Sequence, residues 1–183
     1  MSHYLRYFVP GGTFFFTVVT ARRSPLFMDS RARRLLGDVT RRCFSKYPLT
    51  VIAVVLLPDH LHALWALPAG DARYSLRWSW IKGQFTRQWL SFGGREQPRK
   101  GSRSREGRRS VWQRRFWEHT IRNEDDLEAH FDYIHYNPVK HGYVPRPRDW
   151  RWSTFHRWVA KGHYNINWGA GITPPSVPGN AGE

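Results

Sequence analysis

Cysteine is almost absent from this chain of 183 residues, which contains only Cys43. A disulfide framework and a zinc site built from several cysteines are therefore excluded. No apolar run approaches the length of a membrane span, and the N-terminus lacks the charged-then-apolar pattern of a secretion signal. These absences predict a cytoplasmic protein that has no membrane partner.

Acidic residues are also scarce, with 14 Asp and Glu against 29 Lys and Arg, so the formal net charge is +15. A globular domain this basic usually binds a polyanion, with nucleic acid as the first candidate and an anionic membrane surface as the second. The ten tryptophans favour nucleic acid, because aromatic faces among basic side chains stack on unpaired bases. Most of the aromatic residues must nevertheless form the core.

The hydrophobic patterns predict elements in the order β-α-β-β-α-β-α. The expected strands cover 13–20, 49–57, 60–67 and 111–121, and the expected helices cover 29–46, 74–92 and 123–136. Asp29 or Ser30 and Asn123 are the expected N-caps, and Pro138 is expected to end the last helix before it. This order predicts an α+β fold: a ferredoxin-like single domain over residues 1–168, with an antiparallel sheet and helices packed on one face.

Two segments differ in composition from the rest of the chain. Residues 93–110 are rich in Arg and contain no apolar side chain, which predicts a basic flexible loop within the domain. The stretch 169–183, which carries several prolines and glycines, is expected to be a disordered tail.

A histidine pair, His60 and His62, lies in the apolar run VIAVVLLPDHLHALWALP. In a strand the side chains at i and i+2 point to the same face, so both imidazoles can reach one metal ion. The alternative interpretation is a pair of partly exposed strand histidines without a ligand. The spacing alone leaves both interpretations open.

The helix expected over 123–136 carries two adjacent stripes of side chains. An apolar stripe faces the core, a second stripe contains His130, Tyr133 and Asn137, and Tyr136 is expected to face water. A tyrosine, whose ordinary pKa is about 10, is a weak nucleophile unless the phosphate that it attacks is polarised. Mg²⁺ or Mn²⁺ held by His60, His62 and the amide oxygen of Asn137 can polarise that phosphate. His130 is a candidate for activating Tyr133, although a histidine at a packed helix edge usually has a structural role.

Five motifs in order along the chain resemble those of one known family. They are GGTFFFTV at 11–18, PDHLH at 58–62, WQRRFWEHTIRN at 112–123, DYIHYNPVKHG at 132–142 and DWRWSTFHR at 149–157. They are similar to the motifs of the bacterial REP-associated tyrosine transposases, a group of single-tyrosine HUH transposases. The likeness covers most of residues 4–168.

The resemblance implies a ferredoxin-like fold and metal-dependent cleavage and rejoining of single-stranded DNA at REP-type palindromic hairpins, through a 5′-phosphotyrosine intermediate. It implies that His60, His62 and Asn137 hold Mg²⁺ or Mn²⁺ and that Tyr133 is the nucleophile. The basic residues near these motifs are candidates for contacts with DNA phosphates: Arg114, Arg115, Arg122, Lys140 and His141. Both a monomer and a homodimer are compatible with the resemblance.

Two other functional classes remain open at this point. A non-catalytic ferredoxin-like domain that binds single-stranded nucleic acid would need neither metal nor Tyr133. A metal-dependent phosphodiesterase using activated water would cleave DNA without forming a protein–DNA adduct.

Overall fold

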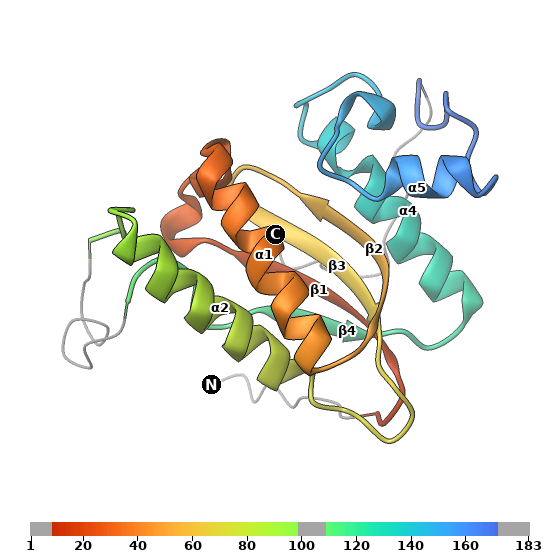
Figure 1. The fold of residues 1–183 in the computed structure, drawn as a ribbon. Coiled ribbons are helices and arrows are strands. Elements are labelled where there is room, and N and C mark those ends of the chain that lie inside the picture. The colour runs from red at the N-terminus through yellow and green to blue at the C-terminus, as the bar shows by residue number, and fades with distance from the viewer. Residues whose placement is uncertain (1–8, 99–108, 172–183) are drawn as a thin grey trace, which may run out of the picture.

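Four strands form one antiparallel sheet in the order β2-β3-β1-β4 (Figure 1). The structure is a computed structural model and describes residues 9–98 and 109–171. The strands are β1 (Thr13–Val19), β2 (Thr50–Leu56), β3 (His60–Ala66) and β4 (Trp117–Thr120). One helix joins β1 to β2 and another joins β3 to β4, which gives the ferredoxin-like arrangement. The expected α+β class, with an antiparallel sheet in a single domain, is confirmed.

Within the described residues, the main helices are α1, α2, α4 and α5, and three short 3₁₀ turns accompany them. The helices cover Ser30–Lys46 (α1), Tyr74–Ser91 (α2), Glu124–Lys140 (α4) and Phe155–Ala160 (α5), and the turns cover Ala21–Arg23, Leu26–Met28 and Pro147–Asp149. Both expected N-caps form, because the side chain of Asp29 accepts from the Arg31 backbone N–H and that of Asn123 accepts from the Asp126 N–H. These caps satisfy backbone donors that the first helical turns leave open.

Helices cover both faces of the sheet (Figure 1). The helices α1 and α2 pack on one face, against side chains such as Phe16 and Trp65. The sequence patterns predict that all helices pack on one face. This prediction is wrong for α4, which packs on the opposite face against Phe15 and Leu64. The side chains of β1 and β3 are nearly all buried on both faces of the sheet. Both faces must therefore be covered by other elements, and α4 covers the second face.

Two predicted boundaries are wrong. The strand expected over 111–121 is reduced to β4, because its pairing with β1 is not continuous: Trp112 forms an isolated bridge with Thr20, and regular pairing begins only at Trp117. The last helix does not end before Pro138 but continues to Lys140. Proline forgoes only its own backbone hydrogen bond here, and the His141 N–H closes the helix on the Asn137 carbonyl at 3.0 Å.

The described ends of the segment 93–110 are joined to each other. The Glu96 carboxylate accepts from the Arg109 guanidinium at 3.0 Å and from the Ser110 backbone N–H at 2.7 Å. Residues 99–108 of the expected loop and residues 172–183 of the expected tail lie outside the described residues. Across 9–98 and 109–171, no helix is long and apolar enough to cross a membrane.

The C-terminal segment is attached to α4 through a buried histidine. His135 forms hydrogen bonds with the Thr154 hydroxyl at 2.9 Å and with the Tyr164 hydroxyl at 3.2 Å. Burial lowers the pKa of His135 from its ordinary value of 6.5 to about 3. The imidazole is therefore neutral in the folded protein at neutral pH.

This neutral histidine predicts a loss of stability in acid. Because the unfolded chain binds a proton below pH 6.5 and the folded His135 does so only near pH 3, the free energy of unfolding falls with pH in that window. The contribution of this one group is at most about 1.4 kcal/mol per pH unit. In urea denaturation between pH 7 and pH 4, His135→Gln is expected to reduce the slope, and His156→Gln on the exposed side of α5 to leave it unchanged. Equal slopes in wild type and His135→Gln would contradict this account.

Candidate active site

The histidine pair points toward α4 from the start of β3. His60 and His62 lie on the same face of the sheet as Leu64, and their ring centroids are 5.0 Å apart. Their exposed fractions are 1% and 0%, so the interpretation as a partly exposed pair is wrong. The two imidazoles share one buried environment, as the spacing predicts.

Each imidazole is held by a hydrogen bond at its Nδ1 atom. His60 Nδ1 is 2.6 Å from the Asp59 carboxylate, and His62 Nδ1 is 2.9 Å from the Thr17 hydroxyl. Burial by itself raises the pKa of Asp59, but the hydrogen bonds from His60 and Arg23 hold that pKa below its ordinary value. Nε2 is therefore the ring atom through which each histidine can bind a metal. Sequence reasoning missed Asp59 and Thr17, although the place of Asp59 beside His60 in PDHLH was an available signal.

Tyr133 is the tyrosine that meets the histidines. Its ring lies 5.3 Å from the His62 ring, and its side chain is 5% exposed. The Lys140 ammonium donates a hydrogen bond to the Tyr133 hydroxyl at 3.0 Å and lies 4.7 Å from the ring centroid. Lys140 was expected to contact DNA, and its contact with Tyr133, seven residues earlier on the same face of α4, was missed because the helix was expected to end before Pro138.

Asn137 is fully buried on α4, one turn after Tyr133 and one turn before His141. Tyr133 packs against His62, and His141 packs against His60 at 5.3 Å. Residues four apart lie on one side of a helix, so Asn137 lies between these two contacts and faces the histidine pair. The structure therefore brings Tyr133 to the histidine pair and places Asn137 on the same side of α4.

Tyr136 does not face water, as the sequence analysis expected. Its side chain is 8% exposed, and the ring of Trp168 packs edge-on against it at 6.2 Å. The prediction is wrong because the segment after α5 returns to cover α4, a contact that the periodicity of α4 alone does not reveal. The ring beside His62 is still that of Tyr133.

His130 belongs to a second cluster, with His119 and Asp126. His119 Nε2 lies 2.8 Å from the Asp126 carboxylate, and His130 Nδ1 lies 2.7 Å from the Asp126 carbonyl. Burial lowers the pKa of His130. The hydrogen bonds of His130 therefore go to Asp126, whereas the expected role was activation of Tyr133. Donor atoms of these three residues lie within 4.8 Å of one another, which makes the cluster a competing place for a metal ion.

The other basic candidates are exposed at two places. Arg114 and Arg115 precede β4, and Arg122 follows it. Lys140 and His141 end α4 beside the histidine pair. Of these residues, Lys140 contacts Tyr133 and His141 contacts His60.

Comparisons with known proteins identify the family. A scan against protein-family models found no match. The chain is 42% identical over 173 residues to the REP-associated tyrosine transposase of Escherichia coli K12, covering 94% of each protein. The chain belongs to the REP-associated tyrosine transposases. A protein of Haemophilus influenzae Rd assigned to this family is 43% identical over 169 residues, covering 92% of this chain and 94% of that protein.

A solved structure of a REP-associated tyrosine transposase has the same fold. That protein, bound to a REP hairpin, matches with a TM-score of 0.77 and 40% sequence identity, over 98% of this chain and 100% of its own. Transposases are enzymes that act on DNA, so the expected family and enzyme class are confirmed.

The Asp126 cluster predicts a specific loss of stability. The Asp126 carboxylate accepts hydrogen bonds from His119 and from the Arg122 backbone N–H, which ties β4 to the start of α4. Asp126→Asn is expected to lower the free energy of unfolding by about 1–3 kcal/mol, the cost of leaving a buried polar partner unsatisfied. Asp125→Asn, on the exposed side of the same helical turn, is the control and should have little effect. Urea denaturation at neutral pH measures both, and equal effects would contradict the assignment.

Proposed function

We propose that this chain cleaves and rejoins single-stranded DNA at REP-type palindromic hairpins through a covalent bond between Tyr133 and a 5′-phosphate. The observation that carries the proposal is the packing of Tyr133 against His62, with the Lys140 ammonium on its hydroxyl oxygen. The relative solved in complex with a REP hairpin supports the substrate class. The net charge of +15 is also that expected of a DNA-binding protein.

In the cleavage step the Tyr133 hydroxyl oxygen attacks the scissile phosphorus. A bond forms between that oxygen and phosphorus, the bond between phosphorus and the 3′-oxygen breaks, and the 3′-oxygen leaves as a hydroxyl after taking up a proton. The phenol proton passes to solvent, and the Lys140 ammonium stabilises the phenolate through its 3.0 Å hydrogen bond. Attack by a 3′-hydroxyl on the phosphotyrosine reverses these changes and rejoins the strand without an external energy source.

The proposed metal ligands are His60, His62 and Asn137, and their donors fit a divalent cation. Both imidazoles are buried and oriented through Nδ1, and Asn137 adds an amide oxygen. Mn²⁺ accepts imidazole together with oxygen ligands, and Mg²⁺ prefers oxygen. When bound, either ion would polarise the phosphoryl oxygens and offset the negative charge of the transition state.

The nucleophile is tested with two matched tyrosine variants. Tyr133→Phe removes the attacking oxygen, so it is expected to abolish the covalent adduct with a labelled REP hairpin oligonucleotide in Mg²⁺ or Mn²⁺. Tyr136→Phe removes the same oxygen from a buried tyrosine three residues later and is expected to retain the adduct. A denaturing gel measures the adduct. The mechanism is wrong if wild type forms none or if Tyr133→Phe still forms it.

The metal site is tested without DNA, so that its readout does not depend on activity. Mn²⁺ binding, measured by calorimetry or by electron paramagnetic resonance of the free ion, is expected to weaken at least about tenfold in His62→Ala, because a protein ligand is lost. His119→Ala, in the competing cluster, should leave the affinity unchanged. If His119→Ala weakens Mn²⁺ binding and His62→Ala does not, the metal site is instead the cluster of His119, Asp126 and His130.

The same measurements separate the alternative functions. Tight DNA binding that needs neither metal nor Tyr133, with no adduct, would identify a non-catalytic single-strand-binding domain. Metal-dependent cleavage without an adduct would identify a phosphodiesterase that uses activated water.

A further inference from the structure

A line of aromatic rings leads away from the histidine pair. The His141 ring lies 5.3 Å from His60, and the Tyr143 ring lies 5.9 Å from His141. The line continues to Trp150 at 5.5 Å and from there to Trp152 at 5.0 Å. These four side chains, His141, Tyr143, Trp150 and Trp152, are called the aromatic path below. The path connects the candidate active site on β3 to the neighbouring edge strand β2.

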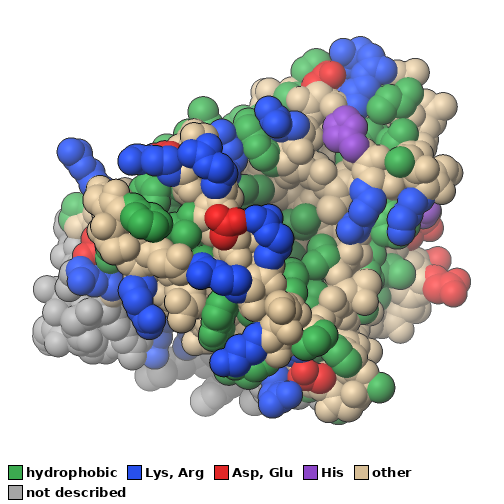
Figure 2. Space-filling model, viewed as in Figure 1, with side chains coloured by type: hydrophobic (Ala, Val, Ile, Leu, Met, Phe, Trp, Pro, Cys, Tyr) green, Lys and Arg blue, Asp and Glu red, His purple; other side chains and the backbone are tan. Residues whose placement is uncertain are grey.

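The aromatic path ends at a basic cavity on α1. The cavity has a volume of about 510 Å³ and is lined by Arg33, Arg34, Arg41, Arg151 and Trp152, among others. The Arg33 guanidinium lies 4.3 Å from the Trp152 ring centroid, and that of Arg151 lies 5.9 Å from it. The Asp38 carboxylate also lines the cavity but is paired with Arg41, so the cavity keeps an excess of positive charge. In Figure 2, Lys and Arg side chains are spread over this side of the molecule.

The aromatic path is anchored at one ring and open at others. Trp150 is 9% exposed, and its ring N–H donates to the Leu56 carbonyl at 3.0 Å, which ties the path to β2. Tyr143 is 43% exposed, and His141 and Arg151 are exposed as well. A fixed buried ring with accessible neighbours provides a surface on which other flat groups can stack without reordering the protein.

The chemistry of the path and of the cavity points to one kind of ligand. Guanidinium groups bind phosphates, and aromatic faces stack on bases, but the bases of a duplex are already stacked on each other. We propose that the aromatic path and its basic cavity hold the unpaired DNA next to the scissile phosphate, with bases on Tyr143 and Trp152 and phosphates on Arg34 and Arg151. This inference rests on the proposed function, because it takes the histidine pair as the place of cleavage.

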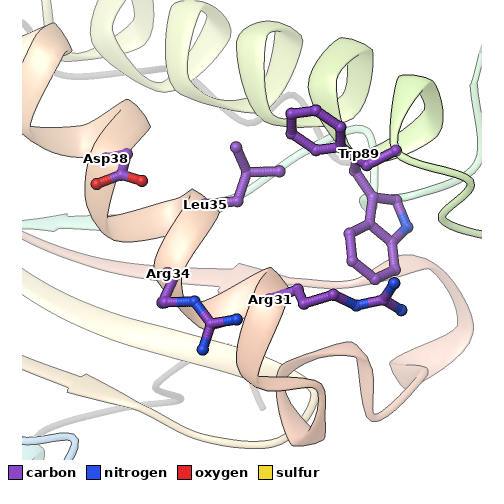
Figure 3. A pocket seen from close by; sticks show the side chains of 6 residues that line it. Arg31, Arg34, Leu35, Asp38 and Trp89 are labelled. Carbon is purple, nitrogen blue, oxygen red and sulfur yellow. The ribbon is translucent and has the colours of Figure 1, made fainter.

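A neighbouring cavity shares Arg34 and Asp38 with the basic cavity but differs in its other lining residues (Figure 3). It has a volume of about 240 Å³ and lies between α1 and α2, lined by Arg31, Leu35 and Trp89 among others. The Arg31 guanidinium is held by both oxygens of the Asp29 carboxylate, and Trp89 is only 6% exposed. This cavity therefore supplies matched controls.

The test measures binding in a Tyr133→Phe background, in which no covalent adduct is expected to form. The probes are a fluorescent REP hairpin oligonucleotide with single-stranded flanks on both sides and the same hairpin with blunt ends. Tyr143→Ala and Arg151→Gln are each expected to weaken binding of the flanked probe about tenfold, as for loss of one stacked base or one phosphate contact. Both should bind the blunt hairpin as their parent does.

Two matched variants in the neighbouring cavity serve as controls. Phe92→Ala removes an aromatic ring that is 68% exposed, and Arg31→Gln removes one positive charge. Both are expected to bind the two probes as their parent does, and thermal unfolding confirms that all four variants fold.

Three outcomes overturn the inference. Equal weakening of both probes by Tyr143→Ala and Arg151→Gln would assign the path to the hairpin stem. Unchanged binding would show that DNA does not contact the path, and equal effects in the control pair would show a general charge effect. Binding is measured by the fluorescence anisotropy of the labelled probe, which does not require cleavage. These results are therefore independent of the gel experiment that detects the covalent adduct. If the wild-type protein, which retains Tyr133, forms no adduct, the proposed function is refuted even if the flanked probe binds along the aromatic path.

Discussion

The site depends on the burial of β3 on both of its faces. The odd-numbered side chains of this strand pack under α1 and α2, and the even-numbered ones, His60 and His62 included, face α4. A buried imidazole needs hydrogen-bond partners, and Asp59 and Thr17 provide them at Nδ1. Both rings are therefore oriented by the fold itself. A ligand that arrives at Nε2 meets a preorganised pair and pays little for ordering it.

Local patterns in the sequence predict those structural features that are determined by residues close together in the chain. The alternation in β3, the caps of α1 and α4, and the stripe that carries Tyr133 all follow from strand and helix geometry. The failures depend on contacts between distant segments. Tyr136 is buried by Trp168, and α4 continues through Pro138 because the rest of the helix is already held in place. The contact of Lys140 with Tyr133 likewise depends on the continuation of α4 beyond Pro138, which places the two side chains on one face of the helix.

The helix α4 carries Tyr133 between two fixed points. At its N-terminal end the Asp126 carboxylate joins His119 and the Arg122 backbone N–H. In its middle, His135 attaches the helix to the C-terminal segment through Thr154. Because the hydrogen bonds of the Asp126 cluster already satisfy its carboxylate, metal binding there would have to displace them. The same donors that make the cluster resemble a metal site thus act, in this fold, as a support for the helix that holds the proposed nucleophile.

The edge strand β2 connects the two sides of the sheet. Its last residue, Leu56, accepts from the Trp150 ring and donates its backbone N–H to the Trp152 carbonyl at 2.9 Å. From the other side, Arg33 of α1 reaches over the Trp152 ring. Rings and guanidinium groups therefore meet where β2 ends, within reach of both layers. In the proposed arrangement, a single strand leaving the histidine pair passes around this edge without crossing the apolar layer, so that a site on the α4 face would use arginines that belong to α1.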